Sequence, residues 1–111
     1  MEFKVKGNTI ELPSGKSVAF EYPISEAIEV DGVFVVRLRV PVDPMLNENV
    51  CAVDSDGCSL WCVPPIGPLL ERSRFVRIGN AGSLVRLINV DGKTFDLEAR
   101  SGNVVSAYYR R

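Results

Sequence analysis

The sequence NVCAVDSDGCSLWCV fills residues 49–63 and predicts a β-hairpin. Two short apolar runs flank residues 54–57, which read Asp-Ser-Asp-Gly. Asp and Ser favour the early positions of a type I turn, and a following glycine accepts the positive φ that closes such a turn with a bulge. We therefore expect residues 50–53 to pair with residues 59–63, which places Trp61 on the second strand.

Other hairpin signals stand on both sides of this segment. Asp-Gly pairs occur at 31–32 and 91–92, and such a pair between β-rich runs is a strong hairpin signal. Residues 33–40 form the strongest strand candidate, because positions 34, 36, 38 and 40 make one wholly apolar face. The opposite face is apolar at 33 and 35 and polar from Arg37 onward. We expect this strand to begin covered on both faces and to end with one face in water.

The whole chain predicts an all-β fold. About ten short strands follow one another, with turn signals at the spacing of roughly 8–12 residues that all-β folds show. No long segment keeps a helical period, and strands adjacent in sequence usually pair antiparallel. We expect a single all-β domain over residues 1–111. It would be an antiparallel meander whose strongly bent sheet closes as a small barrel or sandwich.

Composition argues against several classes of partner. The chain is 46% apolar and 24% charged, which is ordinary for a soluble globular protein, and its net charge of -1 gives no general attraction to nucleic acid or anionic membranes. No apolar run approaches the roughly 18 residues of a membrane span. Met1 is followed by Glu2 and Lys4 rather than by the apolar region of a signal peptide. We expect no nucleic-acid or membrane partner and a cytoplasmic location.

Charge is divided unevenly along the chain. Residues 1–70 hold 5 basic and 10 acidic side chains, a net charge of -5, and residues 71–111 hold 8 basic and 4 acidic ones, a net charge of +4. Two explanations remain open. The halves attract each other within the folded domain, which we prefer, or the asymmetry marks a binding surface.

The three cysteines lack the pattern of a disulfide framework or a zinc site. Their number is odd, their spacing contains no CxxC pair, and the chain has no histidine. In the expected hairpin register Cys51 faces Trp61, and Val50 faces Cys62. Cys58 and Cys62 then lie on one face about 13 Å apart, too far to bridge. We expect buried, reduced thiols.

The sequence contains no recognisable catalytic set. Without histidine, Ser-His-Asp and Cys-His arrangements are excluded. Asp54 and Asp56 stand close together, but turn composition accounts for them, and the later ligands of a calcium loop are missing. Residues 79–82 lack the Lys-Ser/Thr of a phosphate loop. We expect no enzyme, no cofactor and no metal site; an enzyme that uses Asp, Glu and Arg alone is the remaining enzymatic hypothesis.

Arginines are the first candidates for partner binding. Arg72, Arg74 and Arg77 cluster near Phe75 and resemble a basic patch with an interleaved aromatic. Arg74 and Phe75 point to opposite faces of a strand, however, and the first half of the chain is acidic. A solvated strand edge that discourages association is therefore the preferred interpretation over nucleic-acid binding.

Apolar residues are the second candidates. Leu69 and Leu70 lie in the longest irregular stretch, residues 64–73, and need cover from the sheet or from a partner. Trp61 would serve as an interface anchor if it were exposed, but a tryptophan among apolar strand residues is more often part of the core.

The hairpin resembles a pattern, NV-x-x-VD-x-x-G-x-x-LW, of small uncharacterised bacterial all-β proteins, and the likeness covers roughly residues 20–105. It implies a fold and no activity. The shorter VD-x-x-G-x-x-LW pattern is similar to a blade of quinoprotein-type β-propellers. A chain of this length has room for two blades at most, so a closed propeller would need several chains, and cofactor residues are not recognisable. We therefore interpret this weaker similarity as shared hairpin chemistry. Flanking features of the first group match residues 22–24, 31–32, 82–84, 91–92 and 96–102.

Two functional hypotheses follow. The leading one is a non-enzymatic protein-binding module whose partner is another protein, with an immunity-type toxin inhibitor as one concrete version. A small β scaffold, the missing catalytic set and the divided charge support it. The alternative is a structural homo-oligomer that assembles through strand edges or through residues 64–70.

Overall fold

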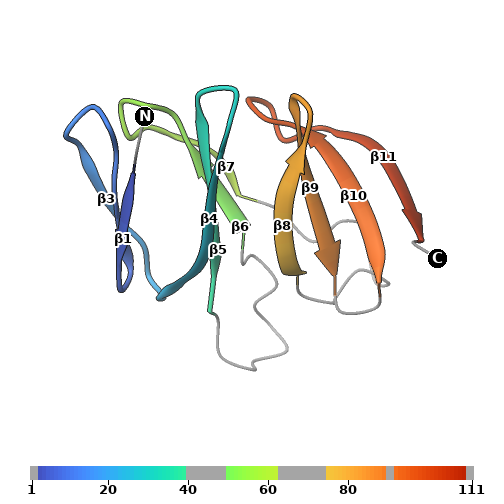
Figure 1. Ribbon diagram of the computed structural model, residues 1–111, viewed down its shortest axis with the longest axis horizontal. Coiled ribbons are helices and arrows are strands. Elements are labelled where there is room, and N and C mark those ends of the chain that lie inside the picture. Colours follow the sequence, from blue (N-terminus) through green and yellow to red (C-terminus); the bar gives the residue numbers. More distant parts are fainter. Residues whose placement is uncertain (1–2, 40–49, 63–74, 90–91, 110–111) are drawn as a thin grey trace.

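The computed structural model describes residues 3–39, 50–62, 75–89 and 92–109. These ranges contain eleven strands and no helix, arranged in three antiparallel sheets that stand side by side (Figure 1). Sheet A holds β1 (Lys4–Lys6), β2 (Thr9–Glu11) and β3 (Ser17–Ala19). Sheet B holds β4 (Ile24–Val30), β5 (Val33–Leu38), β6 (Val50–Val53) and β7 (Ser59–Cys62). Sheet C holds β8 (Phe75–Ala81), β9 (Leu84–Asn89), β10 (Lys93–Glu98) and β11 (Val104–Tyr109).

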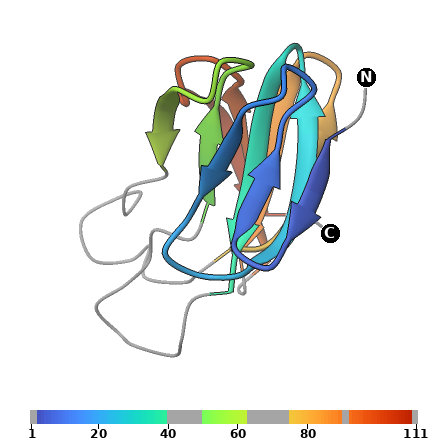
Figure 2. The ribbon, with the colours of Figure 1, turned by 90° about the vertical axis from the view of Figure 1, so that its left-hand side faces the viewer.

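The expected antiparallel all-β meander is confirmed, because strands that follow one another within each sheet are hydrogen-bonded neighbours. Of the two expected closures, a barrel or a sandwich, the barrel is wrong. None of the three sheets closes on itself, and they stack face to face, with sheet A nearest the viewer in Figure 2. Proline cannot donate to a strand ladder. Pro23 separates sheets A and B in the sequence, and Pro64, Pro65 and Pro68 separate sheets B and C, which favours the start of a new sheet at each boundary.

Asp31 and Gly32 form the two-residue loop between β4 and β5, as the sequence predicts. Val30 pairs with Val33 across this loop, and φ is +54° at Asp31 and +81° at Gly32. Two positive φ angles give the mirror-type turn, whose twist matches that of the flanking strands. Asp and Gly tolerate those angles better than most residues do.

The central hairpin has the expected loop and an unexpected bulge. The N–H of Asp54 donates to the carbonyl of Cys58 at 3.0 Å, and Val53 pairs with Ser59. Leu60 is then an extra residue on β7, so Ala52 pairs with Trp61. The predicted pairing of Cys51 with Trp61, and of Val50 with Cys62, is therefore wrong by one position, because a bulge shifts every later pair.

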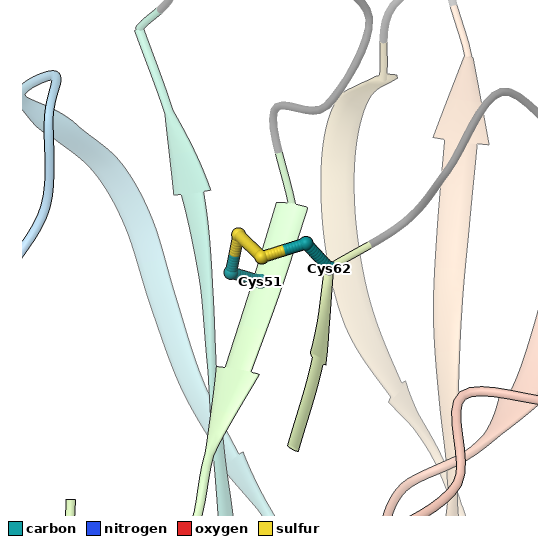
Figure 3. The surroundings of a disulfide bond; sticks show 2 residues. All are labelled: Cys51 and Cys62. Atoms are coloured by element: carbon teal, nitrogen blue, oxygen red, sulfur yellow. A yellow bond between two sulfur atoms is a disulfide. The ribbon is translucent and has the colours of Figure 1, made fainter. Parts of the chain in front are cut away.

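The bulge brings Cys51 and Cys62 directly opposite each other, and they form a disulfide between β6 and β7 (Figure 3). Cys58 is a free thiol and is exposed. The prediction of three buried, reduced thiols is therefore wrong. The assumed register placed Cys51 and Cys62 on opposite faces of the hairpin, which excluded the pairing.

Sheet B lies in the middle of the stack and is covered on both faces. Val33 and Val35 of β5 point toward sheet C, whereas Phe34 and Val36 point toward sheet A. This confirms the prediction that the strand begins buried on both faces. Toward its end Arg37 is partly buried and Arg39, just after the strand, is exposed, whereas residue 40 lies outside the described residues. Each fully buried side chain of this size contributes about 1.5–3 kcal/mol to folding. The core between sheets B and C contains Val30, Val33, Val35, Val50, Ala52, Ile78, Val85, Leu87, Phe95, Leu97 and Ala99. The core between sheets A and B contains Ile10, Leu12, Phe34, Val36, Leu38, Cys51 and Val53.

Side chains also fasten the first strand of sheet B to the first strand of sheet C. Glu26 Oε1 accepts hydrogen bonds from Arg37 Nε at 2.6 Å and from the N–H of Ile78 at 3.2 Å. Asn80 Nδ2 donates to the carbonyl of Glu29 at 3.1 Å. These bonds hold β4 and β8 side by side, so the two sheets share a seam as well as an apolar core.

Candidate functional site

Sheet C has one face packed on sheet B and a second face that points away from the stack. Residues of this second face, named the outer C face below, alternate along the strands with the buried core residues. Among the described residues no further strand covers them. The outer C face consists of Arg77, Leu84, Arg86, Ile88, Thr94, Asp96, Glu98, Ser106 and Tyr108.

Asp96 is the centre of a polar cluster on the outer C face. Its Oδ1 accepts a hydrogen bond from Arg86 Nε at 2.9 Å, and its Oδ2 accepts from Arg86 Nη2 at 3.3 Å and from Ser106 Oγ at 3.4 Å. The hydrogen bond from Arg86, with its positive charge and against the effect of burial, lowers the pKa of Asp96. The same bond raises the pKa of Arg86. The pair therefore stays charged and ties β9 to β10, rather than supplying a general acid.

Thr94 lies buried on the same face, and its hydroxyl has no hydrogen-bond partner in the described structure. It pairs with Ile88 on β9 and with Tyr108 on β11. A buried hydroxyl without a partner costs about 1–3 kcal/mol relative to a satisfied one. The outer C face therefore contains one polar group that folding leaves unsatisfied.

β11 is one of the two edge strands of sheet C, the other being β8, and it exposes apolar side chains. Val104, Val105 and Tyr108 are 45%, 56% and 40% exposed. Val105 is an unpaired residue at an irregularity, because Ser106 pairs with Asp96 and Val104 with Leu97. An edge strand with exposed apolar residues is a template for association with another chain.

The corresponding outer face of sheet A is different. Residues that point away from sheet B alternate with the buried Ile10, and they are small, polar or charged. This outer A face consists of Lys4, Lys6, Thr9, Glu11, Ser17 and Ala19. Its composition is typical of a strand face in contact with water.

Of the predicted partner-binding residues, one lies within the described ranges. Arg77 is exposed and pairs with Ile88, so it stands on the outer C face. Leu69, Leu70, Arg72 and Arg74 lie outside the described residues. No sequence pattern indicates the neighbours of Arg77 on this face, because they come from three other strands.

Trp61 joins sheet B to the turn between β10 and β11. Its ring packs against the core between sheets B and C, and its Nε1 donates to the carbonyl of Ala99 at 2.7 Å. Gly102, with φ +74°, lies so close that a Cβ there would stand 2.7 Å from Trp61 Cγ. Trp61 is thus partly buried and packs against the core, close to the predicted core position, and the glycine is required by this close approach.

The turns at one end of the three sheets enclose a pocket of about 280 Å³ that sequence reasoning missed. Its walls come from four separate connections and from β4 and β5. Arg100 on one wall also borders a second pocket of about 360 Å³, which contains Asp31 and Glu98. The first pocket, named the turn-end pocket below, is lined by Pro13, Ser14, Glu29, Gly32, Phe34, Ser55 and Arg100.

The described residues hold no cluster of metal-ligating side chains and no helix long and apolar enough to cross a membrane. Asp54 acts in its turn, as predicted: its Oδ1 accepts from the N–H groups of Asp56 and Cys58, both at 2.9 Å. This Asx-type bonding explains why Asp stands at that position.

The chain matches one known protein family over almost its whole length. Residues 1–109 match the model of a family described as a domain of unknown function, DUF7957. The chain belongs to the DUF7957 family. Among curated proteins no relative matches it.

Among solved structures, the fold of this DUF7957 domain is similar to the crystal structure of BamB from Moraxella catarrhalis, a β-propeller protein. The TM-score is 0.67 and the sequence identity is 21% over 97% of this chain, which spans 32% of the BamB chain. The likeness agrees with the propeller-type resemblance of the hairpin and concerns the fold alone. The specific NV-x-x-VD-x-x-G-x-x-LW pattern stays a prediction.

Proposed function

We propose that this DUF7957 domain is a non-enzymatic module that binds another protein through the outer C face and the β11 edge. The observation that carries the proposal is the difference between the two ends of the stack. Sheet B is covered on both faces, the outer A face is polar, and the outer C face carries Leu84, Ile88 and Tyr108 with no covering strand among the described residues.

The β11 edge of sheet C also supports a binding role for the outer C face. Val104, Val105 and Tyr108 expose apolar surface along β11. An incoming strand that paired with β11 would gain backbone hydrogen bonds, and the apolar side chains would supply the buried area. Aromatic residues such as Tyr108 are common anchors in such interfaces.

Charge supports a steering role for this face. Arg77 is exposed and takes part in neither ion pair of the described residues, so its charge is free to attract an acidic partner. Such attraction raises the association rate and weakens as salt screens it. We expect the association rate with a purified partner to fall as ionic strength rises; a rate independent of salt would contradict this part of the proposal.

A narrower version is an immunity-type inhibitor that blocks a toxin by covering its active surface. A rigid all-β scaffold without a catalytic set suits such a role, because inhibition by occlusion needs no chemistry. Co-expression with a candidate toxin should restore growth of the producing cell, and a Tyr108→Glu variant should fail to do so.

The alternative proposal is a homo-oligomer that assembles through strand edges. Three such chains would have about the length of the BamB chain. A closed ring, however, would place the outer C face of one copy on the polar outer A face of the next, which disfavours that arrangement. A symmetric dimer through two β11 edges is the version that the exposed valines favour. Sedimentation at micromolar concentration separates the cases, because a monomer excludes the oligomer.

The cytoplasmic location stays a prediction, and the disulfide weighs against it. Disulfides persist mainly in oxidising compartments and are rare in the cytosol. Alkylation of the protein in intact cells, followed by mass spectrometry of the peptides with Cys51 and Cys62, would report their redox state where the protein resides.

Quantitative affinity capture tests the proposed binding face. Wild-type protein, a Tyr108→Glu variant and a Thr9→Glu control on the outer A face would be compared as baits in the native cell extract. We expect the Tyr108→Glu variant to lose a captured protein that the wild type and the control retain. Equal capture by all three baits would contradict the proposal.

A further inference from the structure

The turn-end pocket has an acidic wall and a basic wall, and neither charge is used within the protein. Glu29 is partly buried on β4, and Arg100 is exposed on the turn between β10 and β11. Ion pairs of the described residues lie elsewhere, within sheet B and within sheet C. In the described structure Glu29 and Arg100 therefore have no oppositely charged group within 4.0 Å, although both border one pocket.

The walls of the pocket are held in place by hydrogen bonds and close packing. Ser14 Oγ donates to the carbonyl of Ser55 at 2.6 Å, which joins the β2–β3 and β6–β7 turns. The backbone carbonyl of Glu29 accepts the bond from sheet C already described. A Cβ built on Gly32 would lie 3.6 Å from Arg100 Nη2, so the guanidinium rests directly over the β4–β5 turn. A pocket whose backbone walls are fixed in this way need not reorganise its backbone to accept a ligand.

Apart from Ser14 and Ser55, the rest of the lining is apolar, and the space is small. Phe34 is 1% exposed, and it borders the pocket together with Pro13. A volume of about 280 Å³ lies just below the range of most ligand pockets, which span roughly 300–1,000 Å³. It suits a small metabolite rather than a nucleotide or a folded peptide.

We propose that the turn-end pocket binds a small zwitterion, an α-amino acid with an apolar side chain. Its ammonium group faces the Glu29 carboxylate, its carboxylate faces the Arg100 guanidinium, and its side chain lies against Phe34 and Pro13. A simple cation would use one wall and leave Arg100 without a partner, and a simple anion would leave Glu29 without one. The site is separate from the outer C face and does not depend on the proposed protein binding.

Matched ligands test the two charges separately. The full chain, labelled with ¹⁵N, would be titrated with L-leucine, with leucinamide, which lacks the carboxylate, and with N-acetyl-leucine, which lacks the ammonium group. We expect leucine to shift the amide signals of Gly32, Ser55 and Arg100. Each blocked analogue should bind at least about tenfold more weakly, because a hydrogen bond to a charged group is worth roughly 1.5–3 kcal/mol.

Matched variants locate the charges. Glu29→Gln should weaken leucine at least tenfold and leave N-acetyl-leucine unaffected, whereas Arg100→Gln should weaken leucine and leave leucinamide unaffected. Glu21→Gln and Arg39→Gln, both at exposed positions outside the pocket, serve as controls and should bind leucine as the wild type does. Retained amide spectra would show that each variant is folded.

Two outcomes would overturn the proposal. One is the absence of shifts at the pocket with millimolar leucine. The other is equal binding of leucine and both blocked analogues, which would mean that the apolar lining alone holds the ligand. Neither outcome bears on the outer C face, where Tyr108→Glu is tested with protein partners.

Discussion

The two end sheets of the stack differ in what they present to the outside. Sheet A turns Lys4, Thr9 and Glu11 away from the core, and these side chains need no cover. Sheet C turns outward a charged cluster around Asp96, a buried hydroxyl without a partner, and an edge strand with exposed apolar residues. The outer A face is therefore a polar surface that needs no partner, whereas the outer C face is suited to a further contact.

The difference between the outer A face and the outer C face shows two ways in which a terminal sheet of such a stack can meet its surroundings. A face-to-face stack of sheets always has two terminal faces, and each must be polar, covered or used for binding. Sheet A, with three short strands, is made polar. Sheet C keeps four strands and the mixed composition of an interface.

The largest expected effect lies where sheet C is attached to the stack. Trp61→Ala removes the indole between sheet B and the β10–β11 turn and should lower the free energy of unfolding by about 3–4 kcal/mol. Gly102→Ala should cost about 2–3 kcal/mol, because its Cβ would overlap the indole and its φ is positive. Urea denaturation measures both values.

The double variant sharpens this prediction. Without the indole, Gly102→Ala keeps only its conformational cost of about 1 kcal/mol, so the two changes should be clearly less than additive. Strict additivity would mean that Trp61 and Gly102 act independently and that the observed contact does not hold sheet C in place.

The next largest effect on stability concerns the disulfide of sheet B, the middle sheet, on which sheets A and C both pack. Cys51 and Cys62 are 11 positions apart, and a disulfide that closes a loop of this size stabilises by about 2–3 kcal/mol. Reduction, or the paired change of both residues to Ser, should lower stability by that amount in thermal or urea unfolding. Cys58→Ser is the control and should stay within about 0.5 kcal/mol, because this thiol is exposed and free. Equal loss in both variants would argue against the bond.

Asp96 on the outer C face should give a pH-dependent effect on stability. Its pKa is lowered in the folded protein, so its contribution is present above the unfolded pKa of about 3.9 and is lost as pH falls through the folded value. Asp96→Asn should cost about 1–2 kcal/mol at pH 7, and its difference from wild type should shrink in acid. Glu11→Gln on the outer A face should change stability by less than about 0.5 kcal/mol. A difference for Asp96→Asn that stays constant from pH 7 to strong acid would exclude a charged role for this carboxylate.

The smallest expected effect is a gain in the free energy of unfolding. Thr94→Val removes a buried hydroxyl that has no partner and keeps the shape of the side chain, so we expect stability to be unchanged or raised by up to about 1 kcal/mol. Thr9→Val, on the outer A face, should be neutral within about 0.5 kcal/mol. A loss of more than about 1 kcal/mol for Thr94→Val would show that the hydroxyl is bonded after all.

Local features of the fold could be predicted from the sequence. Asp31-Gly32 predicts its turn because few other residue pairs accept two positive φ angles. The apolar pattern at the start of residues 33–40 predicts burial on both faces there, since periodicity reports directly which sides of a strand avoid water. The turn role of Asp54 follows in the same way from its own side chain.

Features that depend on distant contacts could not be predicted. A bulge at Leu60 moves the later pairs by one position, and nothing in the hairpin sequence distinguishes that register from the regular one. The disulfide of Cys51 and Cys62 was missed for that reason. The turn-end pocket joins residues as distant as Ser14 and Arg100, which only the stacking of three sheets brings together.

The most direct test of the asymmetry between the two ends is site-specific photo-crosslinking in the native cell. A benzophenone amino acid would replace Tyr108 on the outer C face in one variant and Thr9 on the outer A face in the other. We predict a discrete protein adduct from position 108 and none from position 9. Identical adducts from both positions, or an adduct from position 9 alone, would contradict the claim that sheet C carries the binding face.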